Sequence, residues 1–373
     1  MTRFARTDTS ILGHWWWTID RWSMAAVALL FVYGVMLTMA ASPPVAERLH
    51  FEQFHFVRRQ LVFLPLAIVI MFAVSLMTPR GIRRLAVMVF AVSILLMIAT
   101  LFFGPEIKGA RRWINIAGLS LQPSEFIKPS LAVVTAWAFA RQHKSGEPVW
   151  RNVAIGLYVL VVGLLLLQPD FGMTVVVSAV WFGQFFLAGL PMMWVAGFLI
   201  LGLLGAGGAY FALPHVASRI DRFIDPSSGD SYQVSRSMEA FMNGGLLGRG
   251  PGEGSVKSVL PDAHTDFVFA VAGEEFGLIA CLLLVGLFAF IVLRGFARVI
   301  KEPDLFTLLA VTGLLVQFGL QSLVNMGSTL SLIPTKGMTL PFISYGGSSL
   351  TAIALLIGMV LALTRNRRGR EAL

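Results

Sequence analysis

Long apolar runs dominate this chain and restrict what it can fold into. Ten of them have about the length, 17–25 residues, at which an α-helix crosses a bilayer. Over the whole sequence 56% of residues are hydrophobic and 13% are charged, whereas soluble domains have about 45–50% and about 25%. We therefore predict an all-α polytopic membrane protein whose spans cover residues 23–41, 60–77, 84–103, 125–140, 152–168, 170–188, 191–213, 266–293, 304–327 and 345–363.

The distribution of cations predicts the orientation of these spans. Ten spans place both termini on one side, and cytoplasmic segments of membrane proteins are rich in Lys and Arg. With both termini inside, sixteen Lys and Arg residues lie in cytoplasmic segments and seven in the short outer loops. This arrangement predicts cytoplasmic termini and places the long loop between spans seven and eight outside.

The chain is expected to form one membrane domain rather than several units. A cytoplasmic segment of residues 1–22 precedes the ten-helix domain, 23–363, and a basic tail of residues 364–373 follows it. The outer loop, about 214–265, is too short and too rich in glycine for an independent domain. Within it, residues 231–242 are predicted to form a short helix that ends at Gly244-Gly245, since glycine favours helix termination.

The net charge of +9 and the single cysteine exclude two classes of function. The cations follow the pattern of cytoplasmic loops, and no basic stripe with interleaved aromatic residues lies outside the spans, so we expect no nucleic-acid partner. Cys281 lies in an apolar run, which excludes an intramolecular disulfide and a cysteine-based metal site.

Two groups of ionisable residues stand at the edges of spans, where charges are costly and indicate function. Glu125 and Lys128 lie three residues apart at the start of span four, hence on one helical face. They either neutralise each other as a structural pair or line a polar cavity, with Arg111 and Arg112 outside it to meet an anionic head group. Asp170 lies between spans five and six and is either a helix N-cap or part of the same site.

A third group lies where the outer loop enters span eight, in LPDAHTDFVFAVAGEEFG, residues 260–277. Asp266 is placed at the membrane edge, with Gly273 and Gly277 on its helical face and Glu274 beside them. Glycines along this face predict a groove where a ligand approaches the backbone closely. The alternative is that Asp266 serves only as an N-cap.

Two further features of the outer segments remain open. Asp262, His264 and Asp266 alternate at a spacing that could hold a divalent cation. The loop IPTKGMTLPFISYGGSSL, residues 333–350, is rich in Gly, Pro and Ser, and Lys336 is its only cation. Irregular backbone near a membrane is tolerated where it lines a wet cavity, so this loop is expected to border the site.

These segments together closely resemble the SEDS family (shape, elongation, division and sporulation proteins). The resemblance runs from about residue 20 to about residue 365, and it is carried by several long motifs in the family's order. The sequences PTKG and GEEFG resemble those of the family's division branch more than those of its elongation branch. The motifs are GARRWI, QPSEFIK, QPDFG, YQVSRSMEAFMNGGLLGRGPGEG, LPDAHTDFVFAVAGEEFG and PTKGMTLPFISYGGSSL.

The resemblance implies a peptidoglycan glycosyltransferase that polymerises lipid II at the outer face of the cytoplasmic membrane. The family's catalytic aspartate falls on Asp266, and its cavity carboxylate–lysine pair falls on Glu125 and Lys128. We predict that Asp266 acts as the general base that deprotonates the acceptor hydroxyl. No second carboxyl is needed as a proton donor, because the lipid diphosphate leaves as an anion and needs cations instead. The predicted substrate-binding residues are Arg111, Arg112, Glu125, Lys128, Asp170, His264, Glu274 and Lys336.

The resemblance also implies partners and a location. Lipid II, a class B penicillin-binding protein, other division proteins and membrane lipids are the expected partners, at the division septum of the inner membrane. No cofactor is required by the residues, although a divalent cation such as Mg²⁺ at the diphosphate stays open. Two alternative functions are a lipid II flippase and a non-catalytic division scaffold. A flippase site is expected near the bilayer midplane, whereas the charged motifs here gather at the outer edge.

Overall fold

The computed structural model describes residues 10–107, 109–116, 119–189, 192–212, 217–218, 221, 223, 225, 232–334 and 336–365. The predicted N-terminal segment is therefore described only from Ser10 onward, and the predicted basic tail only for Thr364 and Arg365. Most of residues 213–231, the first part of the predicted outer loop, lie outside the described residues.

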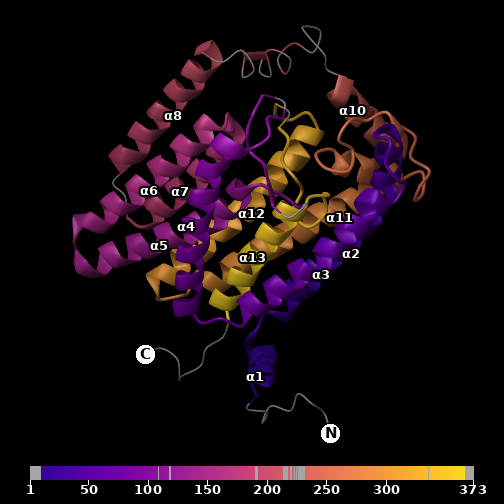
Figure 1. The fold of residues 1–373 in the computed structure, drawn as a ribbon. Coiled ribbons are helices and arrows are strands. Elements are labelled where there is room, and N and C mark those ends of the chain that lie inside the picture. The colour runs from indigo at the N-terminus through magenta and orange to yellow at the C-terminus, as the bar shows by residue number, and fades with distance from the viewer. Residues whose placement is uncertain are drawn as a thin grey trace.

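The described chain is a helical bundle, and each of the ten predicted spans coincides with one of its helices (Figure 1). A short helix, α1 (Ile11–Thr18), precedes them. The ten helices are α2 (Arg21–Arg48), α3 (His55–Ser75), α4 (Pro79–Phe103), α5 (Pro123–Ser145), α6 (Pro148–Leu167), α7 (Phe171–Leu187), α8 (Met192–Ala212), α11 (Val268–Val299), α12 (Leu305–Thr329) and α13 (Gly347–Leu363). The predicted all-α membrane fold is confirmed.

Six of the described helices are long and apolar enough to cross a membrane by length and composition: α2, α3, α4, α6, α11 and α12. Two others, α7 and α13, are apolar but have 17 residues each. The fifth helix, α5, carries Glu125 and Lys128 on buried positions and is correspondingly less apolar. The number of ten crossings and the cytoplasmic placement of the termini stay predictions.

The centre of the bundle is formed by α5, α12 and α13. In Figure 1, α12 and α13 run through the middle, with α2 and α3 on one side and α4 to α7 on the other. Every residue of α13 from Ser348 to Leu363 is buried, whereas α3 and α4 expose long rows of apolar side chains. Apolar exposure of this kind is expected of helices that face lipid tails.

Helix α11 is broken near its N-terminal end, and a loop of the same chain packs against the break. Gly277 has φ 76° and ψ −177°, a conformation that favours glycine. The backbone N–H of Gly250 donates to Glu275 O at 3.0 Å, and that of Leu278 donates to Gly245 O at 2.9 Å. The loop after α10 (Tyr232–Gly244) therefore satisfies the helix groups that the break leaves open.

The predicted short helix of the outer loop is present as α10 (Tyr232–Gly244), and Gly245 follows it with φ 56°. It lies against α11 so closely that a Cβ on Gly273 would meet the Phe241 ring at 2.3 Å. A Cβ on Gly277 would meet the backbone of Gly248 at 2.4 Å. The expectation of a glycine-lined ligand groove is therefore wrong, because α10 and its following loop fill that face. A 3₁₀ turn, η2 (Val256–Ser258), completes the loop.

A small hairpin that the sequence did not predict lies before α5. Its strands, β1 (Ile114–Ile116) and β2 (Leu119–Leu121), pair antiparallel. The hairpin is attached to the bundle through Ser348 of α13, whose hydroxyl donates to Ser120 O at 3.2 Å and accepts from Gln122 N at 3.1 Å. This attachment sets the position of Arg112, just before the hairpin, and of Glu125, just after it.

The described ends of the chain lie together at the end of the bundle opposite α10 (Figure 1). Arg365 donates to Thr18 Oγ1 at 3.1 Å, so α1 contacts the end of α13. Asp20 accepts from Arg294 at 2.6 Å and lies 3.1 Å from Arg298, which ties the start of α2 to the end of α11. Placement of both described ends on one side agrees with the predicted even number of spans.

Candidate active site

Asp266 lies at the junction of two loops that are far apart in the sequence. Its carboxylate packs against Gly337, where an added Cβ would meet Asp266 Oδ2 at 2.8 Å. A backbone hydrogen bond also joins the two loops, since Tyr345 N donates to His264 O at 2.9 Å. Asp266 is half-buried, and its carboxylate faces Gly337.

The predicted pair of Glu125 and Lys128 is present and buried in the bundle. Lys128 Nζ donates to Glu125 Oε2 at 2.8 Å and to Gln321 Oε1 of α12 at 2.9 Å. Gln321 in turn donates through Nε2 to Thr339 O at 3.1 Å, in the loop that contains Gly337. The pair is thus connected to the loop that carries the contact to Asp266.

A second ionic group combines one carboxylate with two cations. Asp170 lies 3.7 Å from Arg112 Nη1 and 3.6 Å from Lys336 Nζ, measured to its carboxylate oxygens. Arg112 also donates to Gln168 O at 2.9 Å and to Pro169 O. Asp170 caps α7 by accepting from Met173 N at 3.2 Å, so the capping role and the ionic role occur together.

The side chain of Lys336 reaches this group by crossing the start of α7. A Cβ on Gly172 would meet Lys336 Cε at 1.8 Å, so any larger residue here would displace the lysine side chain from this position. Lys336 Nζ is buried and has no hydrogen-bond partner among the described residues. Burial lowers the pKa of Lys336 to about 8, although Asp170 and Glu125 oppose that shift, while Lys128 and Arg112 add to it. These five side chains therefore form one electrostatically coupled group, hereafter the charge cluster.

The charge cluster has an excess of positive charge. It contains the cations Arg112, Lys128 and Lys336 and the carboxylates Glu125 and Asp170, which leaves one net positive charge when all are ionised. An anion that enters beside Lys336 gains a hydrogen-bond donor that has no partner in this structure. The arrangement is suited to bind a phosphate or diphosphate group.

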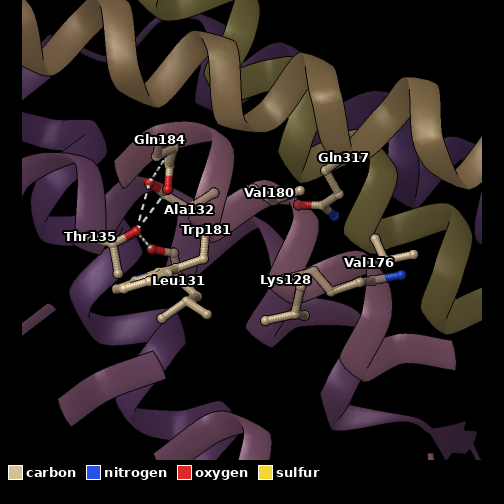
Figure 2. Close-up of a pocket in the computed structure, with 10 residues that line it drawn as sticks. Lys128, Leu131, Ala132, Thr135, Val176, Val180, Trp181, Gln184 and Gln317 are labelled. Atoms are coloured by element: carbon tan, nitrogen blue, oxygen red, sulfur yellow. Dashed lines mark hydrogen bonds between the residues drawn. The ribbon is translucent and has the colours of Figure 1, made fainter. Parts of the chain in front are cut away.

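A small internal cavity lies between α5, α7 and α12 on the inner side of Lys128 (Figure 2). Its lining includes Lys128, Thr135, Val176 and Gln317. At the end of the cavity away from Lys128, Thr135 Oγ1 donates to Gln184 Oε1 at 2.9 Å, and Gln184 Nε2 donates to Ala132 O at 2.7 Å.

Three of the predicted substrate-binding residues lie apart from the charge cluster. Arg111 is exposed and lies 3.6 Å from Glu106, at the surface. Glu274 is fully buried in α11, where it accepts from Ser255 N at 2.9 Å and Val256 N at 3.0 Å. Its carboxylate thus anchors the outer loop, because buried backbone N–H groups require an acceptor.

His264 is an aromatic packing residue rather than an exposed ligand. Its ring packs against those of Phe56 and Tyr345, with ring centroids 4.6 Å and 5.4 Å away, and these two rings also contact each other. Burial lowers the pKa of His264 to about 4. The cation site considered for Asp262, His264 and Asp266 has no support, since no three His, Cys, Asp or Glu side chains converge anywhere in the described chain.

We expect replacement of His264 by phenylalanine to keep activity within about threefold, because the neutral ring acts through packing. The folded state lowers the pKa of His264 to about 4, below the unfolded value of about 6.5. Protonation therefore favours the unfolded protein, and wild type should lose thermal stability as the pH falls from about 6.5 toward 4, more steeply than H264F. Melting temperatures of both proteins in detergent across this pH range test the expectation, and parallel curves would contradict it.

Several site residues were not predicted from the sequence. Gly337, Thr339, Gln321 and Asn325 connect the predicted residues to each other. Gln321 and Asn325 could have been identified from the sequence, because they are polar residues four positions apart in an apolar helix. No sequence pattern predicts that Gly337 lies beside Asp266, because this contact depends on how two distant loops meet.

Comparison with known proteins places this geometry in context. A family model described as "Cell cycle protein", for FtsW, RodA and SpoVE, matches residues 21–369. A probable peptidoglycan glycosyltransferase FtsW of Caulobacter vibrioides is 47% identical over 98% of this chain and 94% of its own length. The protein with the same description in Acinetobacter baylyi is 36% identical over 90% of this chain and 87% of its own length.

Two solved structures have the same fold. One is described as "Structural coordination of polymerization and crosslinking by a peptidoglycan synthase complex". It has a TM-score of 0.74 and 31% identity and covers 93% of this chain and 97% of that one. The other is the rod shape determining protein RodA of Thermus thermophilus, with a TM-score of 0.67 and 31% identity over 94% of this chain and 97% of that one.

Proposed function

The chain belongs to the FtsW/RodA/SpoVE family of cell cycle proteins, and on that premise we propose that it is a peptidoglycan glycosyltransferase. It joins lipid-linked disaccharides, lipid II, into glycan strands at the outer face of the cytoplasmic membrane. The SEDS resemblance of the sequence and the glycosyltransferase names of its relatives agree. The protein is an integral membrane protein of the inner membrane. We propose that both of its termini lie in the cytoplasm and that it works at the division septum.

One observation carries the assignment of the site. Lys336 and Gly337 are consecutive, yet Lys336 reaches the charge cluster while Gly337 contacts the carboxylate of Asp266. The residue that packs against the proposed base and the residue that reaches the charge cluster are therefore joined by a single peptide bond. Glycosyl transfer from a lipid diphosphate needs this pairing, since one reactant must lose a proton and the other must leave as an anion.

The proposed reaction uses Asp266 as the base. Its carboxylate accepts the proton of the acceptor sugar hydroxyl while that oxygen forms a bond to the anomeric carbon of the donor. The bond between the anomeric carbon and the diphosphate oxygen breaks, and its electron pair leaves with the polyprenyl diphosphate. Glycosidases need a second carboxyl group to protonate a sugar leaving group. A diphosphate is stable as an anion, so Arg112, Lys128 and Lys336 stabilise it instead.

The partners follow from the same proposal. Glycan strands need cross-linking, and one solved relative is described as coordinating polymerization with crosslinking in a synthase complex. We propose a class B penicillin-binding protein as the cross-linking partner, and other division proteins as neighbours at the septum. The polyprenyl tails of lipid II lie among the exposed apolar helices. Any divalent cation would accompany the substrate diphosphate, because the described residues offer no carboxylate cage.

Polymerisation of purified lipid II by the purified protein with its cross-linking partner tests the function. We expect glycan strands that require the protein. A translocation assay with labelled lipid II in vesicles distinguishes the alternatives. Transport without strand formation would replace the polymerase with a flippase, and neither activity in a folded complex would favour a scaffold.

Lys336 predicts a pH dependence of substrate binding. Its pKa of about 8 means that its charge is lost as the pH rises through this value, so the affinity for the diphosphate falls at higher pH. If only the protonated form binds, the apparent Kd rises about tenfold between pH 7 and pH 9. K336R keeps its charge over this range and should show a flat profile. The measurement is lipid II binding in detergent, and equal slopes for both proteins would exclude Lys336 as the titrating group.

A further inference from the structure

Helix α12 carries a row of buried amides on one face. Gln317, Gln321 and Asn325 are four residues apart, so they lie one above the other along the helix. All three are almost fully buried. A buried amide is costly unless it is hydrogen-bonded, so each one needs a structural or functional reason.

Asn325 joins the loop that contains Asp266 to the loop that contains Gly337. Its Nδ2 donates to Asp266 O at 2.9 Å and to Met338 O at 2.6 Å. Both partners are carbonyl oxygens and accept only, so the amide must present its nitrogen to them, which fixes its orientation. The Asn325 side chain therefore links Asp266, the proposed base, to Met338, which follows Gly337.

Gln321 makes the corresponding connection to the charge cluster. Its Oε1 accepts from Lys128 Nζ at 2.9 Å, and its Nε2 donates to Thr339 O at 3.1 Å and to Thr339 Oγ1 at 3.3 Å. Thr339 Oγ1 lies 2.6 Å from Ser349 Oγ of α13, which holds the far side of the loop. The lysine can only donate, so this amide is also fixed in orientation.

Together these contacts attach both halves of the site to one rigid element. Met338 and Thr339 are consecutive, and each is held by a different amide of α12. Lys336 and Gly337 come directly before them and provide the contacts to Asp170 and Asp266. The separation of Gln321 and Asn325 along α12, about 6 Å at 1.5 Å per residue, therefore sets how far the base lies from the cations.

We propose that Gln321 and Asn325 are positioning residues that hold Asp266 and the charge cluster at the separation needed for glycosyl transfer. The proposal rests on the proposed function. Neither amide touches the reacting atoms, so they act through the backbone of Asp266 and through Lys128 and Thr339. A displacement of about 1 Å in a catalytic group can lower the rate on the order of 10²-fold, while binding by the remaining cations is kept.

The test compares N325L and Q321L with Q317L in the complex with the cross-linking partner. Leucine is close in size to both amides and removes their hydrogen bonds. Q317L is the matched control, because Gln317 lies on the same face, one turn from Gln321, and its amide has no hydrogen-bond partner among the described residues. In Figure 2 its side chain lies beside the internal cavity. Turnover and KM for lipid II are measured, with melting temperature as a check on folding.

We expect N325L and Q321L to lower kcat on the order of 10²-fold with KM for lipid II within about threefold, and Q317L to match wild type. Wild-type turnover in N325L would overturn the proposal, and so would an equal loss in all three variants. A raised KM with unchanged kcat would also overturn it, because that result indicates direct substrate contact. If N325L does not accumulate folded, N325D, which keeps the size and loses the NH₂ group, is judged by the same criteria.

D266N is measured beside these variants to separate the two proposals. An active D266N would overturn the assignment of the base and this inference with it. An inactive D266N together with a fully active N325L would overturn only the positioning role and leave the proposed function intact.

Discussion

Replacement of Asp266 by asparagine is expected to abolish glycan polymerisation while the protein stays folded in membranes. The substitution keeps the size of the side chain beside Gly337 and removes its capacity to accept a proton. General-base catalysis contributes about 10²–10⁴-fold, so strand formation from lipid II should fall by about that factor. The measurement is polymerisation by purified D266N and wild type, each with the cross-linking partner, at equal amounts of folded protein.

D262N is the matched control for this experiment. Replacing Asp262 by asparagine makes the same chemical change four residues earlier in the same loop. Its φ of 53° lies in the left-handed region, which asparagine tolerates. We expect D262N to keep activity within about threefold. Substantial activity in D266N would remove Asp266 from the role of base, and equal losses in both variants would indicate damage to the loop rather than loss of a proton acceptor.

The second large effect is expected at the buried pair of Glu125 and Lys128. Replacing Lys128 by methionine leaves the Glu125 carboxylate without its cation at a position that is 5% exposed. Breaking one partner of a buried pair costs about 3–5 kcal/mol, so K128M should be strongly destabilised in detergent. It should also lose polymerase activity, since the charge cluster loses one of its three cations.

The double variant E125Q/K128M separates the two consequences. A neutral glutamine beside methionine no longer leaves a buried charge, so we expect most of the thermal stability to return. Activity should not return, because the cation is still missing. Recovery of both would mean that the pair is only structural, as the sequence left open, and recovery of neither would mean that the packing around α5 depends on the ion pair itself.

The site was predicted unevenly, and the reasons are physical. Arg112, Lys128, Asp170 and Lys336 were named from the cost of charge near a membrane, and the structure brings them together. Charge in an apolar setting is a local property that can be read along the chain. Their roles in substrate binding stay predictions until the variants are measured.

Other predicted residues lie elsewhere for reasons that spacing does not contain. His264 is two residues from Asp266, yet its ring packs against Phe56 and Tyr345, which belong to distant parts of the chain. Glu274 satisfies backbone N–H groups of the outer loop. Gly277 allows the break in α11 that the same loop fills. Each outcome depends on which segment packs against the residue.

The sequence by itself determined the membrane fold and its helices. A helix in lipid must satisfy its own backbone hydrogen bonds over about 20 consecutive residues, so each span is specified by a local run of apolar side chains. The tertiary structure alone decided how the ends of these helices meet. The contact of Asp266 with Gly337 and the bridges made by Gln321 and Asn325 join segments separated by 13 to 193 residues, from Asn325–Met338 to Lys128–Gln321. Packing among helices creates such contacts, and no local pattern in the chain encodes them.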